Sequence, residues 1–193
     1  MAFLNYSEFA RQIRESDCRK CGLHKTRTSI VVDRGNPDAK ILLIGEAPGK
    51  DEDETGKPFV GRSGKLLDQI FSEAGINTDK DCLIINVLKC RPPANRTPTP
   101  EEAETCYPFL LKQISLSACR TIVLLGRTAL LRIEPKYAKV KMTDLFAVPF
   151  TSGQFPDKEI LVLFHPAYIL RNRGKKPLMV EAVSKHLKKL VQS

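Results

Sequence analysis

Four short apolar runs, alternating with segments of helical period, constrain the fold of this chain most strongly. The runs occupy residues 41–44, 83–85, 121–125 and 160–164, and nearly all of their side chains are apolar. Such runs are typical of parallel strands whose two faces are both covered. Apolar residues recur at helical spacing over residues 66–74, and Gly75 ends that pattern. The alternation predicts an α/β fold with a mainly parallel sheet.

Two further helices are expected from local signals. Thr99, Pro100 and Glu102 form an N-terminal signature, in which threonine caps the helix, proline takes the tolerated first position and glutamate completes a capping box. A last helix is expected over about residues 178–190, whereas residues 134–156 show no firm period. The length of 193 residues is that of one domain, so we expect residues 1–193 to fold as a unit.

The charge balance favours a polyanionic partner. Lysine and arginine number 31 against 22 acidic residues, which gives a net charge of +9. Arg171, Arg173, Lys175 and Lys176 fall in an expected loop before the last helix, and such clustering fits a series of phosphates better than scattered solubilising charge. Neither a signal peptide nor a membrane-spanning run is visible, so we expect a cytoplasmic protein with no membrane partner.

The cysteines predict a metal site. In a reducing cytoplasm disulfides are rare, so the Cys18-x2-Cys21 pair, followed by Cys90 and Cys106, is interpreted as a ligand set. Four thiolates bind either an iron–sulfur cluster or tetrahedral zinc, and this spacing does not choose between them. In the alternative interpretation, Cys106 is a core residue of its helix and Cys90 an incidental loop thiol. The two other cysteines stand at strand starts and are expected to be buried hydrophobes; they are Cys82 and Cys119.

Polar residues gather where three of the expected strands end. The first strand runs into Gly45-Glu-Ala-Pro-Gly49, the second into Asn86 and Cys90, and the fourth into His165. Because ligands of open α/β sheets bind beyond the carboxyl ends of the strands, we expect these loops to share one site. The Asn86 amide is suited to reading a base. The acids of residues 51–54 argue against a phosphate-binding loop, and hence against a nucleotide hydrolase.

Two residues near these loops are open to a structural and a functional interpretation. Phe59, between a proline and a valine, suits either a core anchor or a platform on which a base stacks. His165 suits either a structural hydrogen-bonding role at a strand end or a role in the site that the three loops form.

Four motifs together resemble the family 4 uracil-DNA glycosylases, the thermophile-type enzymes that carry a [4Fe-4S] cluster. The motifs are residues 45–49, 56–61 (Gly-Lys-Pro-Phe-Val-Gly), 86–96 and 165–171, and the similarity runs from about residue 18 to residue 171. The resemblance implies a three-layer α/β/α sandwich around a four-stranded, mainly parallel sheet. It also implies a monomeric, nucleoid-associated enzyme that acts on uracil-containing DNA, and it selects [4Fe-4S] over zinc at Cys18, Cys21, Cys90 and Cys106.

The resemblance further implies a role for each residue of the site. Phe59 stacks on the flipped uracil, and Asn86 bonds its pyrimidine edge, accepting from N3–H and donating to O4. His165 faces uracil O2, where negative charge grows as the glycosidic bond breaks. Gly45, Glu46 and Ala47 line the pocket. Other uracil-DNA glycosylases place an aspartate where Ala47 stands, so positioning of water is expected to fall to Glu46 or to a following acid, with Glu52 the best choice by offset.

The resemblance also suggests how DNA is held. Ile169 or Leu170 is expected to enter the space that the flipped base leaves, although both also suit an ordinary helix core. Arg91, Arg96, Arg171 and Arg173 are candidate phosphate contacts. Residues 91–105 contain no histidine, so we expect ordinary turnover rather than covalent trapping of DNA. The rival hypothesis is a non-catalytic, metal-stabilised nucleic-acid-binding module.

Overall fold

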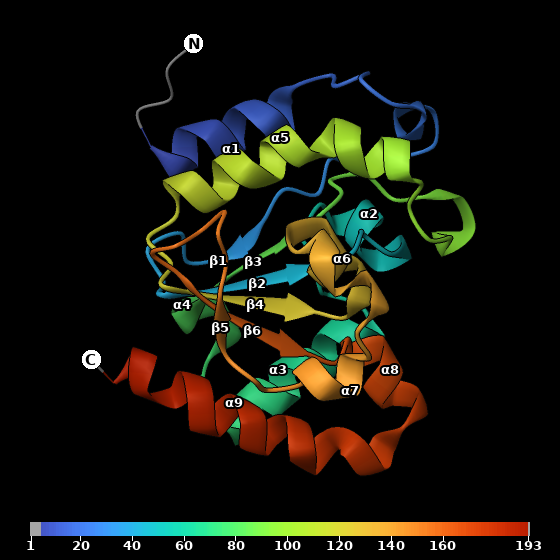
Figure 1. Ribbon diagram of the computed structural model, residues 1–193. Coiled ribbons are helices and arrows are strands. Elements are labelled where there is room, and N and C mark those ends of the chain that lie inside the picture. Colours follow the sequence, from blue (N-terminus) through green and yellow to red (C-terminus); the bar gives the residue numbers. More distant parts are fainter. Residues whose placement is uncertain (1–4, 193) are drawn as a thin grey trace.

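The computed structural model describes residues 5–192, in which a six-stranded sheet lies between two layers of helices (Figure 1). The strands are β1 (Arg34–Gly35), β2 (Ile41–Gly45), β3 (Cys82–Asn86), β4 (Thr121–Leu125), β5 (Phe150–Thr151) and β6 (Glu159–Leu163), in the spatial order β1-β3-β2-β4-β6-β5. The four central strands are parallel, and the two-residue edge strands β1 and β5 are antiparallel to their neighbours. The predicted α/β class is confirmed, with two edge strands added.

Residues 5–192 form nine α-helices, and the three that the sequence predicted, over residues 66–74, from residue 100 and over residues 178–190, are among them. The nine helices are α1 (Tyr6–Glu15), α2 (Lys50–Thr55), α3 (Arg62–Glu73), α4 (Thr78–Asp81), α5 (Pro100–Leu116), α6 (Arg127–Ile133), α7 (Met142–Leu145), α8 (Pro166–Arg171) and α9 (Lys176–Val191). Short 3-10 turns are η1 (Gly22–Lys25), η2 (Pro93–Asn95), η3 (Pro135–Lys139) and η4 (Arg173–Lys175). Thr99 and Glu102 form the predicted capping box of α5. None of the helices within residues 5–192 is long and apolar enough to cross a bilayer.

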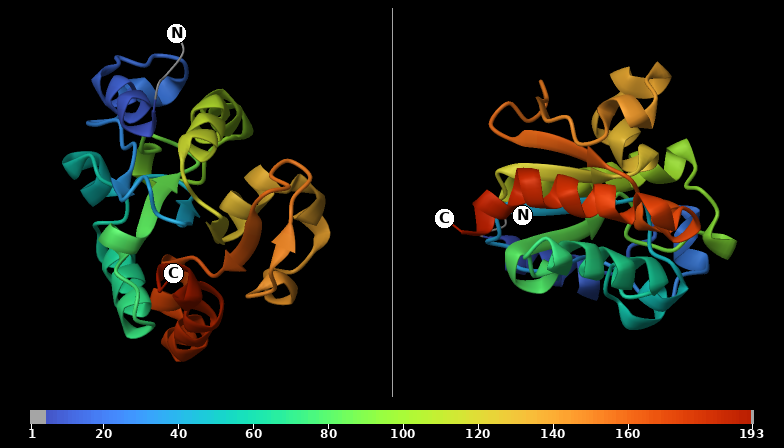
Figure 2. Two further views of the ribbon diagram at one scale, coloured as in Figure 1. Left: turned by 90° about the vertical axis from the view of Figure 1, so that its left-hand side faces the viewer. Right: turned by 90° about the horizontal axis from the view of Figure 1, so that it is seen from below.

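Each face of the sheet carries its own core. Leu42 and Ile44 of β2 point to the layer of α1, α5 and α6, whereas Ile41 and Leu43 point to α3, α8 and α9. All four side chains are fully buried, as the apolar runs require of strands covered on both sides. The two views of Figure 2 show the layers, with α9 beside α3 on one face. The three-layer arrangement therefore follows from alternation along each strand.

Hydrogen bonds beyond the strand ends join the first two polar loops. Gly45 and Asn86 are partners at the carboxyl ends of β2 and β3. Past that pair, the N–H of Val87 donates to the Gly45 carbonyl at 2.9 Å, and that of Leu88 to the Glu46 carbonyl at 3.1 Å. The backbone that follows Asn86 is thus fixed to the loop that carries Glu46.

Candidate active site

The loops after β2, β3 and β6 share one cavity of about 270 Å³ at the carboxyl edge of the sheet. Its lining includes Glu46, Phe59, Asn86 and His165, together with Ala47, Pro48, Gly49, Glu52, Ser63, Pro92, Asn95, Arg96 and Ala167. The expected convergence of the three loops is therefore present in the fold. We refer to this cavity as the base pocket.

Asn86 presents an unsatisfied acceptor to the base pocket. Its side chain is 2% exposed, and within residues 5–192 its buried Oδ1 has no hydrogen-bond partner. A buried acceptor without a partner costs about 1–3 kcal/mol, so native structures keep one only where another demand requires it. A ligand that donates a hydrogen bond, such as the N3–H of a pyrimidine, would remove this penalty.

Phe59 lies beside Asn86 in a backbone conformation that few aromatic residues adopt. Its φ is +56°, in the left-handed region, and its ring is 5% exposed. A Cβ on Gly45 would lie 2.5 Å from the Phe59 ring and 2.4 Å from Asn86 Oδ1, and a Cβ on Gly64 would lie 1.9 Å from the Phe59 carbonyl oxygen. Two glycines therefore provide the space in which the ring and the amide sit, although Gly45 lies behind them rather than in the lining of the pocket.

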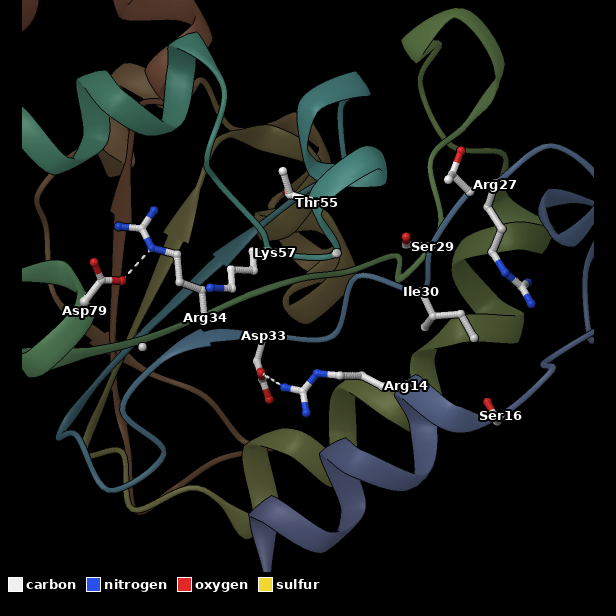
Figure 3. Close-up of a pocket in the computed structure, with 13 residues that line it drawn as sticks. Arg14, Ser16, Arg27, Ser29, Ile30, Asp33, Arg34, Thr55, Lys57 and Asp79 are labelled. Carbon is white, nitrogen blue, oxygen red and sulfur yellow. Dashed lines mark hydrogen bonds and ion pairs between the residues drawn. The ribbon is translucent and has the colours of Figure 1, made fainter.

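Arg34 holds the Phe59 backbone from the other side. Its Nη1 donates to the Phe59 carbonyl oxygen at 2.6 Å, and the rest of the guanidinium bonds Asp68 at 2.7 Å, Asp79 at 2.6 Å and Thr78 at 3.0 Å. Figure 3 shows Arg34 directed at Asp79. Both residues, together with Lys57, line a cavity of about 830 Å³. Every arm of Arg34 is thus occupied, which makes it a rigid support for Phe59.

The hydrogen bonds of His165 fix its tautomer. Its Nδ1 accepts from the Ala167 N–H at 3.1 Å, as the N-cap of α8, so this nitrogen carries no proton. Burial, aided by the positive charge of Arg171, lowers the pKa of His165 from 6.5 to about 4. The ring is therefore neutral at physiological pH with its proton on Nε2. A neutral imidazole with a free Nε2–H is a hydrogen-bond donor to the pocket.

The two glutamates of the base pocket have different environments. The Thr128 hydroxyl donates to one oxygen of the half-buried Glu46, and the other oxygen has no partner among residues 5–192. Glu52 is buried, and its carboxylate accepts from the backbone N–H groups of Gly49 at 3.1 Å, Val60 at 3.0 Å and Gly61 at 2.8 Å. The geometry of Glu52 is that of a clamp on the Phe59 loop, which disagrees with the expectation that it positions water.

The four cysteines of the expected ligand set surround one region on the α5 side of the sheet. Cys90 interacts electrostatically with Cys21 and Cys106, and Cys106 with Cys18 and Cys21. Burial, reinforced by these neighbours, raises the pKa of Cys90 to about 12. Cys82 and Cys119 lie elsewhere and are buried, as expected.

Hydrogen-bond donors also point at this group of thiols. Arg27 donates to Cys90 Sγ at 3.7 Å and to the Cys18 carbonyl at 2.7 Å, and the Lys89 N–H donates to the Cys106 thiol. Among the described residues, no three His, Cys, Asp or Glu side chains lie close enough to hold a single metal ion. A four-iron cluster has a different requirement, because each thiolate binds its own iron and the sulfurs stand further apart. The donor set and its N–H···S bonds fit such a cluster.

The residues expected to contact DNA divide into exposed and structural ones. Arg171 and Arg173 are exposed at the end of α8 and in η4. Arg91 donates to Asn95 Oδ1, and Arg96 forms a bidentate ion pair with Glu102 at 2.6 and 2.9 Å. Arg96 therefore ties the loop of residues 91–96 to α5, although it also lines the base pocket.

Ile169, one of the two wedge candidates, has almost no exposed surface in this structure. Its side chain is 1% exposed and packs in the core between the sheet, α3 and α9. A side chain buried there has no free surface to offer a duplex. Leu170 is half-buried and faces a second cavity, so of the two wedge candidates only Leu170 has the exposure that the role needs.

Sequence reasoning missed three residues that shape the site: Arg34, Thr128 and Lys89. Arg34 lies on a two-residue strand, which has no detectable period, and Thr128 lies far from Glu46 along the chain. Lys89 is buried, and its Nζ donates to the Asn86 carbonyl at 2.5 Å. Burial lowers the pKa of Lys89 to about 8. Only Lys89 had a sequence signal, since it lies between two residues already singled out.

The amino-acid sequence of this chain is similar to those of known proteins. A family model described as the uracil DNA glycosylase superfamily matches residues 32–188. The chain is 47% identical over 162 residues to the type-4 uracil-DNA glycosylase of Thermotoga maritima, and the matched region covers 83% of this chain and 82% of that protein. It is 42% identical over 165 residues to the type-4 uracil-DNA glycosylase of Archaeoglobus fulgidus, covering 79% and 78% of the two chains. The chain therefore belongs to the uracil DNA glycosylase superfamily and, within it, to the type-4 family.

Proposed function

We propose that this protein removes uracil from DNA by hydrolysing the N-glycosidic bond, which releases free uracil and leaves an abasic site for base excision repair. The observation that carries the proposal is the buried Oδ1 of Asn86, which has no partner within residues 5–192, in a pocket that also holds an aromatic ring and a neutral histidine. The type-4 relatives bear the name of this activity.

Recognition depends on Phe59 and Asn86. The target base leaves the duplex and stacks against the Phe59 ring, while Asn86 Oδ1 accepts from uracil N3–H and Nδ2 donates to O4. Cytosine carries an acceptor at N3 and a donor at N4, so both contacts would be mismatched. Discrimination by buried polar groups of this kind is strong, since the wrong base leaves them unpaired.

Catalysis depends on His165 and Glu46. As the C1′–N1 bond breaks, its electron pair passes to uracil, and the His165 Nε2–H donates to O2, where the negative charge develops. A water molecule adds to the cationic C1′ of the sugar. The proton that it loses neutralises the uracil anion, so that neutral uracil is released. Glu46 is the acid that orients this water, because one of its oxygens has no partner within residues 5–192 and the other is fixed by Thr128.

A [4Fe-4S] cluster held by Cys18, Cys21, Cys90 and Cys106 is part of the proposal. Bound there, the cluster supplies cross-links rather than bond-breaking chemistry. Lys89 links the cluster ligands to the base pocket. Its backbone N–H donates to Cys106, and its Nζ donates to the Asn86 carbonyl. The thiols and the base-reading residue are therefore joined within one short segment.

Replacement of Cys90 by alanine is expected to lower both the iron content and the melting temperature, and to reduce uracil excision by loosening the loop after β3. Iron and sulfide analysis, visible absorbance and thermal unfolding measure these effects. The matched control is Cys119→Ala, which removes a buried thiol away from the ligand set and should leave the iron content unchanged. If Cys90→Ala kept full stability and activity, the structural role of the cluster would be wrong.

Arg34 is expected to be a positioning residue for Phe59. Arg34→Ala should weaken inhibition by free uracil on the order of tenfold, because the ring loses its backbone support and small misplacements of binding groups are costly. The control is Arg14→Ala, which lines the same cavity and pairs with Asp33 without reaching Phe59. Arg34→Lys keeps the charge but has a single donor group, so it should recover more of the stability lost in Arg34→Ala than of the lost uracil binding. Equal inhibition constants for all three variants and the wild type would contradict this role.

The decisive test of function is a uracil-containing oligonucleotide treated with the iron-loaded protein and then with alkali. Strand cleavage at the uracil position supports the proposal. Binding without cleavage would favour the rival, a non-catalytic and metal-stabilised nucleic-acid-binding module, and Asn86 would then have no assigned purpose. We expect the enzyme to act as a cytoplasmic, nucleoid-associated monomer.

A further inference from the structure

A cationic cavity of about 500 Å³ lies between α3 and the segment from α8 to the start of α9. Its lining from α3 is Arg62, Lys65, Leu66 and Gln69, which recur at the spacing of a single helical face. Its lining from the opposite side is Ile169, Leu170, Arg173 and Lys176. Four cations thus face one hollow, and none of the described residues that line it is acidic. We refer to it as the cationic cavity.

Most of these cations have no internal partner. Lys176 forms an ion pair with Glu73 at 2.6 Å, but within residues 5–192 no ion pair involves Arg62, Lys65 or Arg173. The cavity that Arg34 lines is different, since its Arg14 and Arg34 are both paired with aspartates (Figure 3). Unpaired cations that converge on a hollow repel one another, and a polyanion would reverse that repulsion.

The cationic cavity and the base pocket are neighbours. Ser63 and Ala167 line the base pocket, while Arg62 and Leu170 of the same two helices line the cationic cavity. The junction of α3 and α8 therefore separates the two. A strand whose uracil enters the base pocket has its adjoining phosphates within reach of this junction, because the backbone continues on both sides of a flipped nucleotide.

We propose that the cationic cavity binds the phosphodiester backbone of the uracil-containing strand next to the flipped nucleotide, with Arg62 and Lys65 as phosphate ligands alongside Arg173. The half-buried Leu66 and Leu170 offer an apolar floor to the adjoining sugar or base. This assignment extends the DNA path onto α3, and it rests on the proposed function for the identity of the strand. Arg62 and Lys65 hold the backbone and do not touch the reacting atoms.

The test is the salt dependence of DNA binding by the full chain in its iron-loaded form. The probe is a single-stranded oligonucleotide with a tetrahydrofuran abasic-site analogue, which is bound but not cleaved. Removal of two phosphate contacts in R62A/K65A should reduce the slope of log K against log salt by about 1.4, since each contact contributes about 0.7. Affinity at moderate salt should fall on the order of tenfold, while inhibition by free uracil stays unchanged, because uracil alone reaches only the base pocket.

The control is K80A/R120A, which also removes two positive charges. Lys80 and Arg120 are exposed at the amino ends of β3 and β4, the edge of the sheet opposite the base pocket. This variant should keep the wild-type slope. R62K/K65R, which keeps both charges, should do the same and provides a folded comparison. A slope for R62A/K65A equal to that of the control would overturn the inference.

The outcome is separable from that of the proposed function. If the wild type excises uracil but R62A/K65A binds with an unchanged slope, the cationic cavity has no role in DNA binding. If the slope falls as expected while the wild type excises nothing, the cavity binds DNA and the assignment of the enzyme activity fails alone.

Discussion

Replacing Asn86 with aspartate is expected to lower kcat/KM for uracil in DNA by about 10²–10³-fold. One carboxylate oxygen still accepts from N3–H, but the other faces uracil O4, an acceptor, where the amide placed a donor. The side chain is buried, so the repulsion between two acceptors is poorly screened and the added charge loses its hydration. Single-turnover excision from oligonucleotides with one uracil measures the loss.

The comparison variant is Asn86→Ala, which removes both hydrogen bonds without adding charge. It should lose uracil activity and gain none on cytosine. Asn86→Asp should instead gain detectable cytosine excision, because one carboxyl oxygen accepts from the N4 amino group and the other, when protonated, donates to N3. Wild-type rates on uracil from either variant would remove Asn86 from its proposed role.

His165→Ala is expected to slow single-turnover excision by about 10²–10³-fold while leaving affinity for DNA nearly unchanged. The Nε2–H donor acts on charge that appears only as the glycosidic bond breaks, so its loss affects the transition state more than the bound substrate. Rates at saturating enzyme, with binding to abasic-analogue DNA measured in parallel, separate the two effects. A large loss of affinity at an unchanged rate would instead make His165 a binding residue.

The neutral state of His165 has a consequence for stability that the same variant tests. Because its pKa is lowered from 6.5 to about 4, the unfolded chain takes up a proton between these values that the native protein does not. The stabilisation, about 3 kcal/mol, is fully present above pH 6.5 and is lost as the pH falls to about 4. Denaturant unfolding at these two pH values should show this dependence in the wild type and a smaller one in His165→Ala.

The central sheet was predictable because each of its four parallel strands is a run of side chains buried on both faces, a pattern that few other structures produce. The edge strands β1 and β5 were not, since two residues cannot display a period. For the same reason residues 134–156 gave no clear prediction, and in the structure they form η3, α7 and β5, all of five residues or fewer. The α1 helix went unrecognised despite its Asn5 N-cap.

The site was predictable to the extent that it follows from strand ends. Asn86 and His165 could be placed together because parallel strands end at the same edge. The support of Phe59 by Arg34 could not be predicted, because Arg34 lies on an edge strand too short to produce a recognisable sequence pattern. For Glu52 and Ile169, spacing along the chain gave the position of the residue but not what its side chain contacts. The Glu52 carboxylate is held by backbone N–H groups of residues 49–61, whereas Ile169 is buried among side chains of the sheet, α3 and α9.

The pairing of Gly45 with Asn86 at the ends of two hydrogen-bonded strands bears on which step of DNA binding costs the most free energy. Groups set on a sheet are already in place before a base arrives, so little binding energy is needed to order the protein. The larger free-energy cost is then that of unstacking and unpairing a nucleotide in the nucleic acid. We therefore expect the local stability of the DNA, more than any closure of the protein, to determine which uracils are reached first.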